Sequence, residues 1–196
     1  MSKANLLDRR SVVSALLAGR KDAVVVGGLG ASTYDIAAAG DHDRNFYLWG
    51  GMGGATMIGL GVALAQPKLP VVVITGDGEM LMGIGSLATI GLQQPGNLTI
   101  VVLDNEVYGE TGGQASHTGA NTDLVGVARA CGIQDARSLA TMAEIEAFAP
   151  LMQDVSAGPR FVSVKIDSAN LERVLASRDG SFIVTRIRGA LGFAPI

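Results

Sequence analysis

Two polar segments carry residue types and spacing that could hold a phosphate group and a metal ion. Gly76-Asp77-Gly78 lets the backbone turn sharply and places N–H groups beside one carboxylate. Asn105 supplies a second oxygen, and the irregular backbone after it can offer a carbonyl. Mg²⁺ prefers such oxygen-only ligands. The segments therefore suggest a phosphate held by Mg²⁺, although a Gly-Asp-Gly turn alone is more often a plain strand-to-helix turn.

Each polar segment follows a run typical of a buried parallel strand. Residues 71–75 and 98–103 are rich in β-branched, apolar side chains. The 26 residues from Glu79 through Asp104 leave room for one helix, one turn and the second strand. Because open α/β sheets bind ligands beyond the carboxyl ends of their strands, we expect Asp77 and Asn105 to lie at neighbouring strand ends and to share one site.

The rest of the chain alternates between strand and helix patterns. Ser32 is in a position to cap a helix through residue 39, and a run of glycines at 50–54 opens a helix through residue 65. Residues 106–120 have little apolar pattern, which indicates a long functional loop. We expect the other helices near 6–17, 81–93, 124–130 and 142–152, and the other strands near 22–26, 46–49 and 161–166. This alternation predicts one α/β domain over 1–196, a doubly wound, mostly parallel sheet with helices on both faces.

Composition narrows the possible partners. The 196 residues are 48% hydrophobic and carry a net charge of −3, without a basic stripe, so nucleic acid is not an expected partner. No apolar run approaches the roughly 18 residues of a membrane span, and the single cysteine, Cys131, cannot form an internal disulfide or hold an iron–sulfur cluster. We expect a cytoplasmic protein without a membrane partner. Its apolar surplus suggests a buried interface with another chain.

The spacing from Gly76-Asp77-Gly78 to Asn105 resembles the diphosphate-binding domain of thiamine diphosphate (ThDP) enzymes. The resemblance implies that Asp77, the Asn105 side chain and the Val107 carbonyl bind Mg²⁺, and that the backbone at Gly76, Gly78 and Glu79 binds the diphosphate. The Glu79 carboxylate is either a solvated group in the first turn of a helix or faces the substrate, and the sequence leaves both open.

Other segments match the family at less specific positions. Met52, flanked by glycines, resembles the large apolar residue that forces the cofactor into its bent conformation, and Gly50 and Gly51 would bring carbonyls near the aminopyrimidine ring. Ser32 is an expected diphosphate contact. The loop residues implied to fold over the cofactor and meet the substrate are Tyr108, Glu110, Thr111, Gln114 and His117. His117 could relay a proton or bind an anionic group.

Residues 85–91 and 103–114 look most like sulfopyruvate and phosphonopyruvate decarboxylases among the ThDP-dependent 2-oxo acid decarboxylases. In this family a glutamate on a separate pyrimidine-binding domain activates the cofactor. The resemblance therefore implies a β subunit that needs a pyrimidine-binding α subunit to supply this glutamate, in an even-numbered hetero-oligomer acting on a small anionic 2-oxo acid. A carboligase of the acetolactate synthase type and a non-catalytic cofactor-binding subunit remain alternatives.

Overall fold

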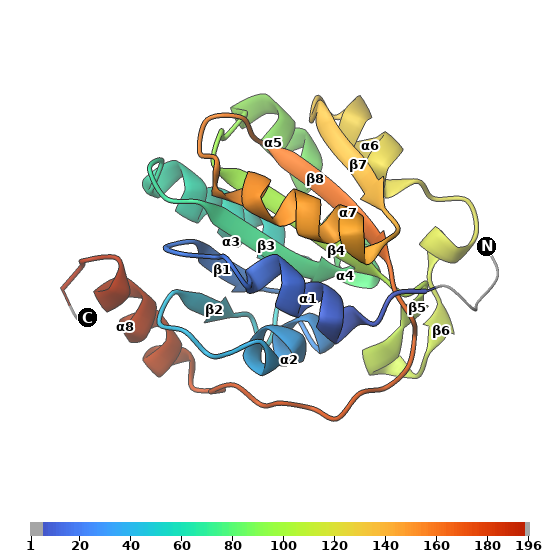
Figure 1. The fold of residues 1–196 in the computed structure, drawn as a ribbon, viewed down its shortest axis with the longest axis horizontal. Helices are drawn as coiled ribbons and strands as arrows, with labels where there is room; N and C mark the ends of the chain where they lie inside the picture. The colour runs from blue at the N-terminus through green and yellow to red at the C-terminus, as the bar shows by residue number, and fades with distance from the viewer. Residues whose placement is uncertain (1–5, 195–196) are drawn as a thin grey trace.

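The computed structural model describes residues 6–194, which form one six-stranded sheet with helices on both faces (Figure 1). The strand order is β2-β1-β3-β4-β8-β7, and every neighbouring pair is parallel. The strands are β1 (Val24–Gly27), β2 (Asn45–Tyr47), β3 (Val71–Gly76), β4 (Leu98–Asp104), β7 (Asp135–Leu139) and β8 (Arg160–Lys165). The predicted doubly wound parallel sheet is confirmed.

Two apolar layers cover the sheet. One contains α1 (Arg9–Leu17), α2 (Ala31–Ala38) and α7 (Met142–Phe148). The other contains α3 (Ala55–Ala65), α4 (Asp77–Met82), α5 (Ser86–Gln93) and α6 (Leu124–Ala130). Helix α8 (Gly180–Ala190) packs beside β2 at the sheet edge and contributes side chains to both layers. Among residues 6–194, no helix is long and apolar enough to span a membrane.

The central strands place the two polar segments side by side. Residues 71–75 of β3 and all of β4 are buried, as expected for strands covered on both faces. Gly76 pairs in register with Leu103, so both strands end at the same edge of the sheet. Asp77 begins α4 directly after β3, and Asn105 is the first residue after β4.

Two expected helices next to the site have different boundaries. The helix expected at 81–93 is two helices, α4 and α5, and between them Gly83 lies so close to Gly53 that a side chain would overlap the Gly53 carbonyl. Helix α2 begins at Ala31 with Gly30 as its N-cap residue, at φ 76°, so Ser32 lies inside the first turn and does not cap the helix.

The segment expected to be a loop contains short elements. These are β5 (Val107–Tyr108), β6 (Gln114–Ala115) and the 3-10 turns η2 (Gly109–Thr111) and η3 (His117–Gly119). The expected helix at 142–152 ends at Phe148 and continues as the 3-10 segment η4 (Ala149–Gln153). After β8, residues 167–179 contain no helix or strand and run along the outer side of α2 to α8 (Figure 1). We call this segment the strap.

Candidate functional site

A cavity of about 370 Å³ lies beyond the carboxyl ends of β1, β3 and β4. Its wall combines the loop after β1, the turn from β3 into α4, the β5 region and the strap. The residues suggested by the sequence that line it are Ser32, Met52, Gly76, Asp77, Gly78, Glu79, Asn105, Val107, Tyr108, Glu110 and Thr111. The structure therefore brings most of the expected site residues together in one place.

Asp77 is held in a fixed orientation by two hydroxyl groups. Asp77 is only 2% exposed. Its carboxylate accepts one hydrogen bond from Ser116 Oγ and another, at 3.1 Å, from Thr118 Oγ1. Burial raises the pKa of Asp77, although these two hydrogen bonds favour the carboxylate. A bound cation would offset the cost of burying this charge. Ser116 and Thr118 were not identified from the sequence.

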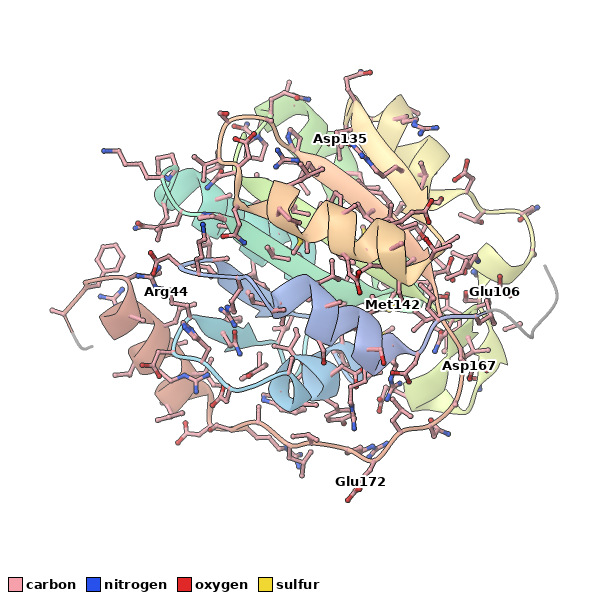
Figure 2. The ribbon with its side chains drawn as sticks, viewed as in Figure 1. Arg44, Glu106, Asp135, Met142, Asp167 and Glu172 are labelled. Carbon is pink, nitrogen blue, oxygen red and sulfur yellow. The ribbon has the colours of Figure 1, made fainter. Side chains whose placement is uncertain are left out.

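Asn105 sits in a turn fixed from two sides. Its Oδ1 accepts a hydrogen bond from the Val107 backbone N–H at 3.1 Å, which closes an Asx turn. Lys165 Nζ lies 2.8 Å from Asp104 Oδ2 and 2.7 Å from Glu106 Oε1, and so ties both flanks of Asn105 to β8. Glu106 lies at the edge of the molecule (Figure 2), beside the hairpin that β5 and β6 form.

Glu79 is buried, which excludes its interpretation as a solvated residue. The residue is 4% exposed, and its Oε2 accepts a hydrogen bond from the Leu29 backbone N–H at 2.8 Å. The carboxyl group thereby connects α4 to the loop after β1, where Gly28 leaves room for it because a side chain at Gly28 would overlap Oε2. Burial raises the pKa of Glu79.

Met52 and Tyr108 pack over the turn into α4. A Cβ added at Gly78 would lie 2.6 Å from the Tyr108 ring and 3.6 Å from Met52 Cε. The two side chains therefore cover the Gly78 backbone so closely that no side chain fits there. Gly50 and Gly51 are exposed and do not belong to the cavity wall. Their expected approach to a cofactor ring is not visible in this chain alone.

His117 lies behind Tyr108 on an exposed turn. Its Nδ1 is 3.4 Å from Tyr108 Oη, and it does not line the cavity. Glu110 lines the cavity, lies close to Gly30 and faces Arg173 of the strap, with Oε2 3.8 Å from Nη2. The hairpin and the strap thus approach each other in the cavity wall.

Two arginines in the wall were missed from the sequence. Arg173 stacks over Tyr34 at 5.4 Å from the ring centroid, and Arg9 lines the cavity from the start of α1. The only sequence signal for the second is the Arg9-Arg10 pair before an apolar helical pattern, and such pairs are usually solvated.

Comparisons with known proteins agree with this geometry. Residues 28–166 match the family model described as thiamine pyrophosphate enzyme, C-terminal TPP binding domain. The chain is similar to a sulfopyruvate decarboxylase subunit beta from Methanothermobacter thermautotrophicus, with 34% identity over 94% of this chain and 98% of the relative. It is also similar to a phosphonopyruvate decarboxylase from Streptomyces viridochromogenes, with 42% identity over 78% of this chain, but it spans only 38% of that protein.

A solved structure shares the fold. A thiamine diphosphate-dependent 4-hydroxybenzoylformate decarboxylase from Rhodococcus jostii superposes with a TM-score of 0.66 at 21% identity, covering 85% of this chain and 34% of that one. The family match covers more than half of the chain and includes both polar segments. The chain therefore belongs to the thiamine pyrophosphate enzymes and carries their C-terminal cofactor-binding domain.

Proposed function

We propose that this chain is the cofactor-binding β subunit of a split 2-oxo acid decarboxylase that acts on sulfopyruvate or phosphonopyruvate in the cytoplasm. The observation that carries the proposal is the placement of Asp77 and Asn105 at adjacent strand ends, lining one cavity. The names of the two relatives, a phosphonopyruvate decarboxylase and a sulfopyruvate decarboxylase subunit beta, support the reaction and the substrate class.

The residues present fit ThDP with Mg²⁺. Asp77, Asn105 and the Val107 carbonyl would supply hard oxygen ligands of the kind that Mg²⁺ prefers. Within residues 6–194, no group of three or more His, Cys, Asp or Glu side chains forms a metal site, so a softer metal finds no alternative cluster in this part of the chain. The missing side chain at Gly78 makes room for the Tyr108 ring over the turn into α4.

Each residue then has a defined task. When bound, ThDP supplies the electron sink through which a 2-oxo acid loses carbon dioxide. Asp77 and Asn105 would hold the metal, and the backbone N–H groups at the start of α4 would bind diphosphate oxygens. Met52 would support the bent form of the cofactor, and Ser32 would donate to the diphosphate from α2.

The hairpin closes the site from the other side. Tyr108 covers the turn into α4, and Glu110 lines the cavity opposite Arg173 of the strap. His117 is close enough to Tyr108 to pass a proton through the Tyr108 hydroxyl, with Nδ1 3.4 Å from Oη.

A partner subunit completes the cleft. We infer that a pyrimidine-binding α subunit supplies the glutamate that activates the cofactor, in an even-numbered hetero-oligomer. Met82, at the end of α4, is 63% exposed and lies beside Gly53, next to Met52. An exposed apolar side chain at this point is suited to burial under the partner. The other large exposed apolar side chains of this helical layer are Met57, Leu64 and Leu92.

Asp77→Asn tests the proposal. Calorimetric titration of ThDP should show that Mg²⁺-dependent binding is lost, and the reconstituted complex should lose decarboxylation of sulfopyruvate and phosphonopyruvate. Asp43→Asn, an exposed carboxylate remote from the cavity, is the matched control and should behave as the wild type. If the complex with Asp77→Asn keeps its full activity, the chain is a non-catalytic subunit.

A further inference from the structure

Arg9 is a buried arginine in the wall of the cavity. It begins α1, and the residue is 7% exposed. Burial of a guanidinium group is costly unless the group is paired, and arginine is the residue best suited to bind phosphate in a bidentate manner. The cavity that Arg9 lines is the one that contains Asp77 and Asn105.

Arg9 shares its carboxylate partner with a neighbour. Arg9 Nε lies 2.8 Å from Asp35 Oδ2, and Arg10 Nε lies 3.1 Å from Asp35 Oδ1. Arg10 also donates to the backbone carbonyl of Glu172 at 2.6 Å, on the strap, and does not line the cavity. The Glu172 side chain itself points away from the molecule (Figure 2). Two guanidinium groups and one carboxylate leave one positive charge, and of the two cations only Arg9 faces the cavity.

The position of Asp35 directs Arg9 toward the start of α2. Asp35 lies three residues after Ser32, so the two side chains are on the same face of the helix. Among the described residues, Asp35 is the only carboxylate that pairs with Arg9, and Arg9 Nε is buried without a hydrogen-bond partner of good geometry although Asp35 Oδ2 lies 2.8 Å away. The guanidinium group is therefore available to an anion bound beside Ser32 and the N-terminus of α2.

We propose that Arg9 binds the terminal phosphate of the cofactor's diphosphate. The inference rests on the proposed function, since it takes ThDP as the ligand of the cavity. A diphosphate carries more negative charge than one Mg²⁺ ion bound by the Asp77 carboxylate can neutralise. Arg9 adds positive charge to the cavity wall on the side of α2, as Arg173 does from the strap, and Asp35 lies beside the Arg9 guanidinium group.

The adjacent arginine provides a matched control. Arg9→Met and Arg10→Met each remove one of the two contacts to Asp35, but only Arg9→Met removes a cation from the cavity wall. Affinities for Mg²⁺–ThDP and for Mg²⁺–pyrophosphate are measured by calorimetry on the full chain with its partner subunit. Hydrogen bonds to charged groups are strong enough that Arg9→Met should weaken both ligands by about 10- to 100-fold. Arg10→Met should change them by less than about threefold.

Folding is controlled separately. If Arg9→Met fails to fold, Arg9→Lys takes its place, because lysine keeps the charge beside Asp35 but lacks the planar fork, and it should weaken both ligands by at least about threefold. A folded Arg9 variant with wild-type affinity for both ligands would overturn the proposal. An effect confined to the KM of the 2-oxo acid would also overturn it, because Arg9 would then recognise the substrate.

The pyrophosphate measurement separates this proposal from the proposed function. If the wild type does not bind ThDP but binds Mg²⁺–pyrophosphate in a manner that requires Arg9, the anion site stands and the assignment of ThDP fails. If the wild type binds neither ligand, both proposals fail. If the wild type binds ThDP and the Arg9 variants bind it equally well, only the role of Arg9 fails.

Discussion

Gly59 and Gly61 lie in the same helix but face different surroundings, which makes the packing of α3 on the sheet measurable. A Cβ at Gly59 would lie 2.2 Å from Val73 Cγ2 of β3, whereas a Cβ at Gly61 would meet no atom within 4 Å. Ordinary contacts of this kind are 3.4–4 Å, so Gly59→Ala is short of space by at least about 1.2 Å. Such overpacking costs about 1–3 kcal/mol, and glycine to alanine in a helix gains up to about 1 kcal/mol.

Comparison of the two variants isolates the packing cost, because the gain in helix propensity is common to both. Gly61→Ala should raise the free energy of unfolding by up to about 1 kcal/mol, and Gly59→Ala should be less stable than Gly61→Ala by about 1–3 kcal/mol. Urea unfolding followed by circular dichroism measures both, with unchanged m-values as the check on two-state behaviour. The close packing of α3 against β3 would be refuted if Gly59→Ala were as stable as Gly61→Ala.

Three further predictions concern pH, association and turnover. Burial lowers the pKa of His42, and the neutral imidazole accepts a hydrogen bond at Nδ1 from the Arg44 backbone N–H at 3.0 Å. The stability that the neutral imidazole contributes is therefore present above about pH 6.5 and is lost as pH falls through the folded-state pKa. Between pH 7.5 and 5, thermal unfolding should show the wild type losing up to about 1 kcal/mol more than His42→Asn, and an equal loss would remove His42 as the cause. Met82→Glu should weaken association with the α subunit in analytical ultracentrifugation, while Leu175→Glu, exposed on the strap, should not; equal effects would remove Met82 from the interface. His117→Ala should lower turnover by about 100-fold or more with ThDP affinity unchanged, and unaltered turnover would exclude a role in proton transfer.

The sequence predicts the centre of this fold better than its edges. Strands β3 and β4 are continuous apolar runs because the sheet buries them on both faces, and their parallel pairing makes the meeting of Asp77 and Asn105 predictable. Strand β7 was missed because it is a five-residue strand at the sheet edge, with Arg137 and Ser138 exposed. Helix α8 was missed in a tail of low apolar pattern that packs beside β2 at the edge of the sheet.

Side-chain burial at the site depends on contacts that no local pattern shows. Glu79 is in the first turn of a helix, where a solvated carboxylate is common, but the missing side chain at Gly28 makes space for it 51 positions earlier in the sequence. Arg9 reaches the cavity because Asp35 of another helix holds it there. The burial of Glu79 and the placement of Arg9 both depend on packing between segments distant in sequence. Local sequence patterns do not predict such packing.

Native mass spectrometry of the chain purified from its own source, with ThDP and Mg²⁺ kept in the buffer, tests the central claim most directly. We predict an even-numbered complex that contains this chain, a second small subunit and bound ThDP. The complex should decarboxylate sulfopyruvate or phosphonopyruvate, and the separated chain should not. A cofactor-bearing oligomer of this chain alone that turns over the 2-oxo acid would contradict the account, because the activating glutamate would then come from within this chain.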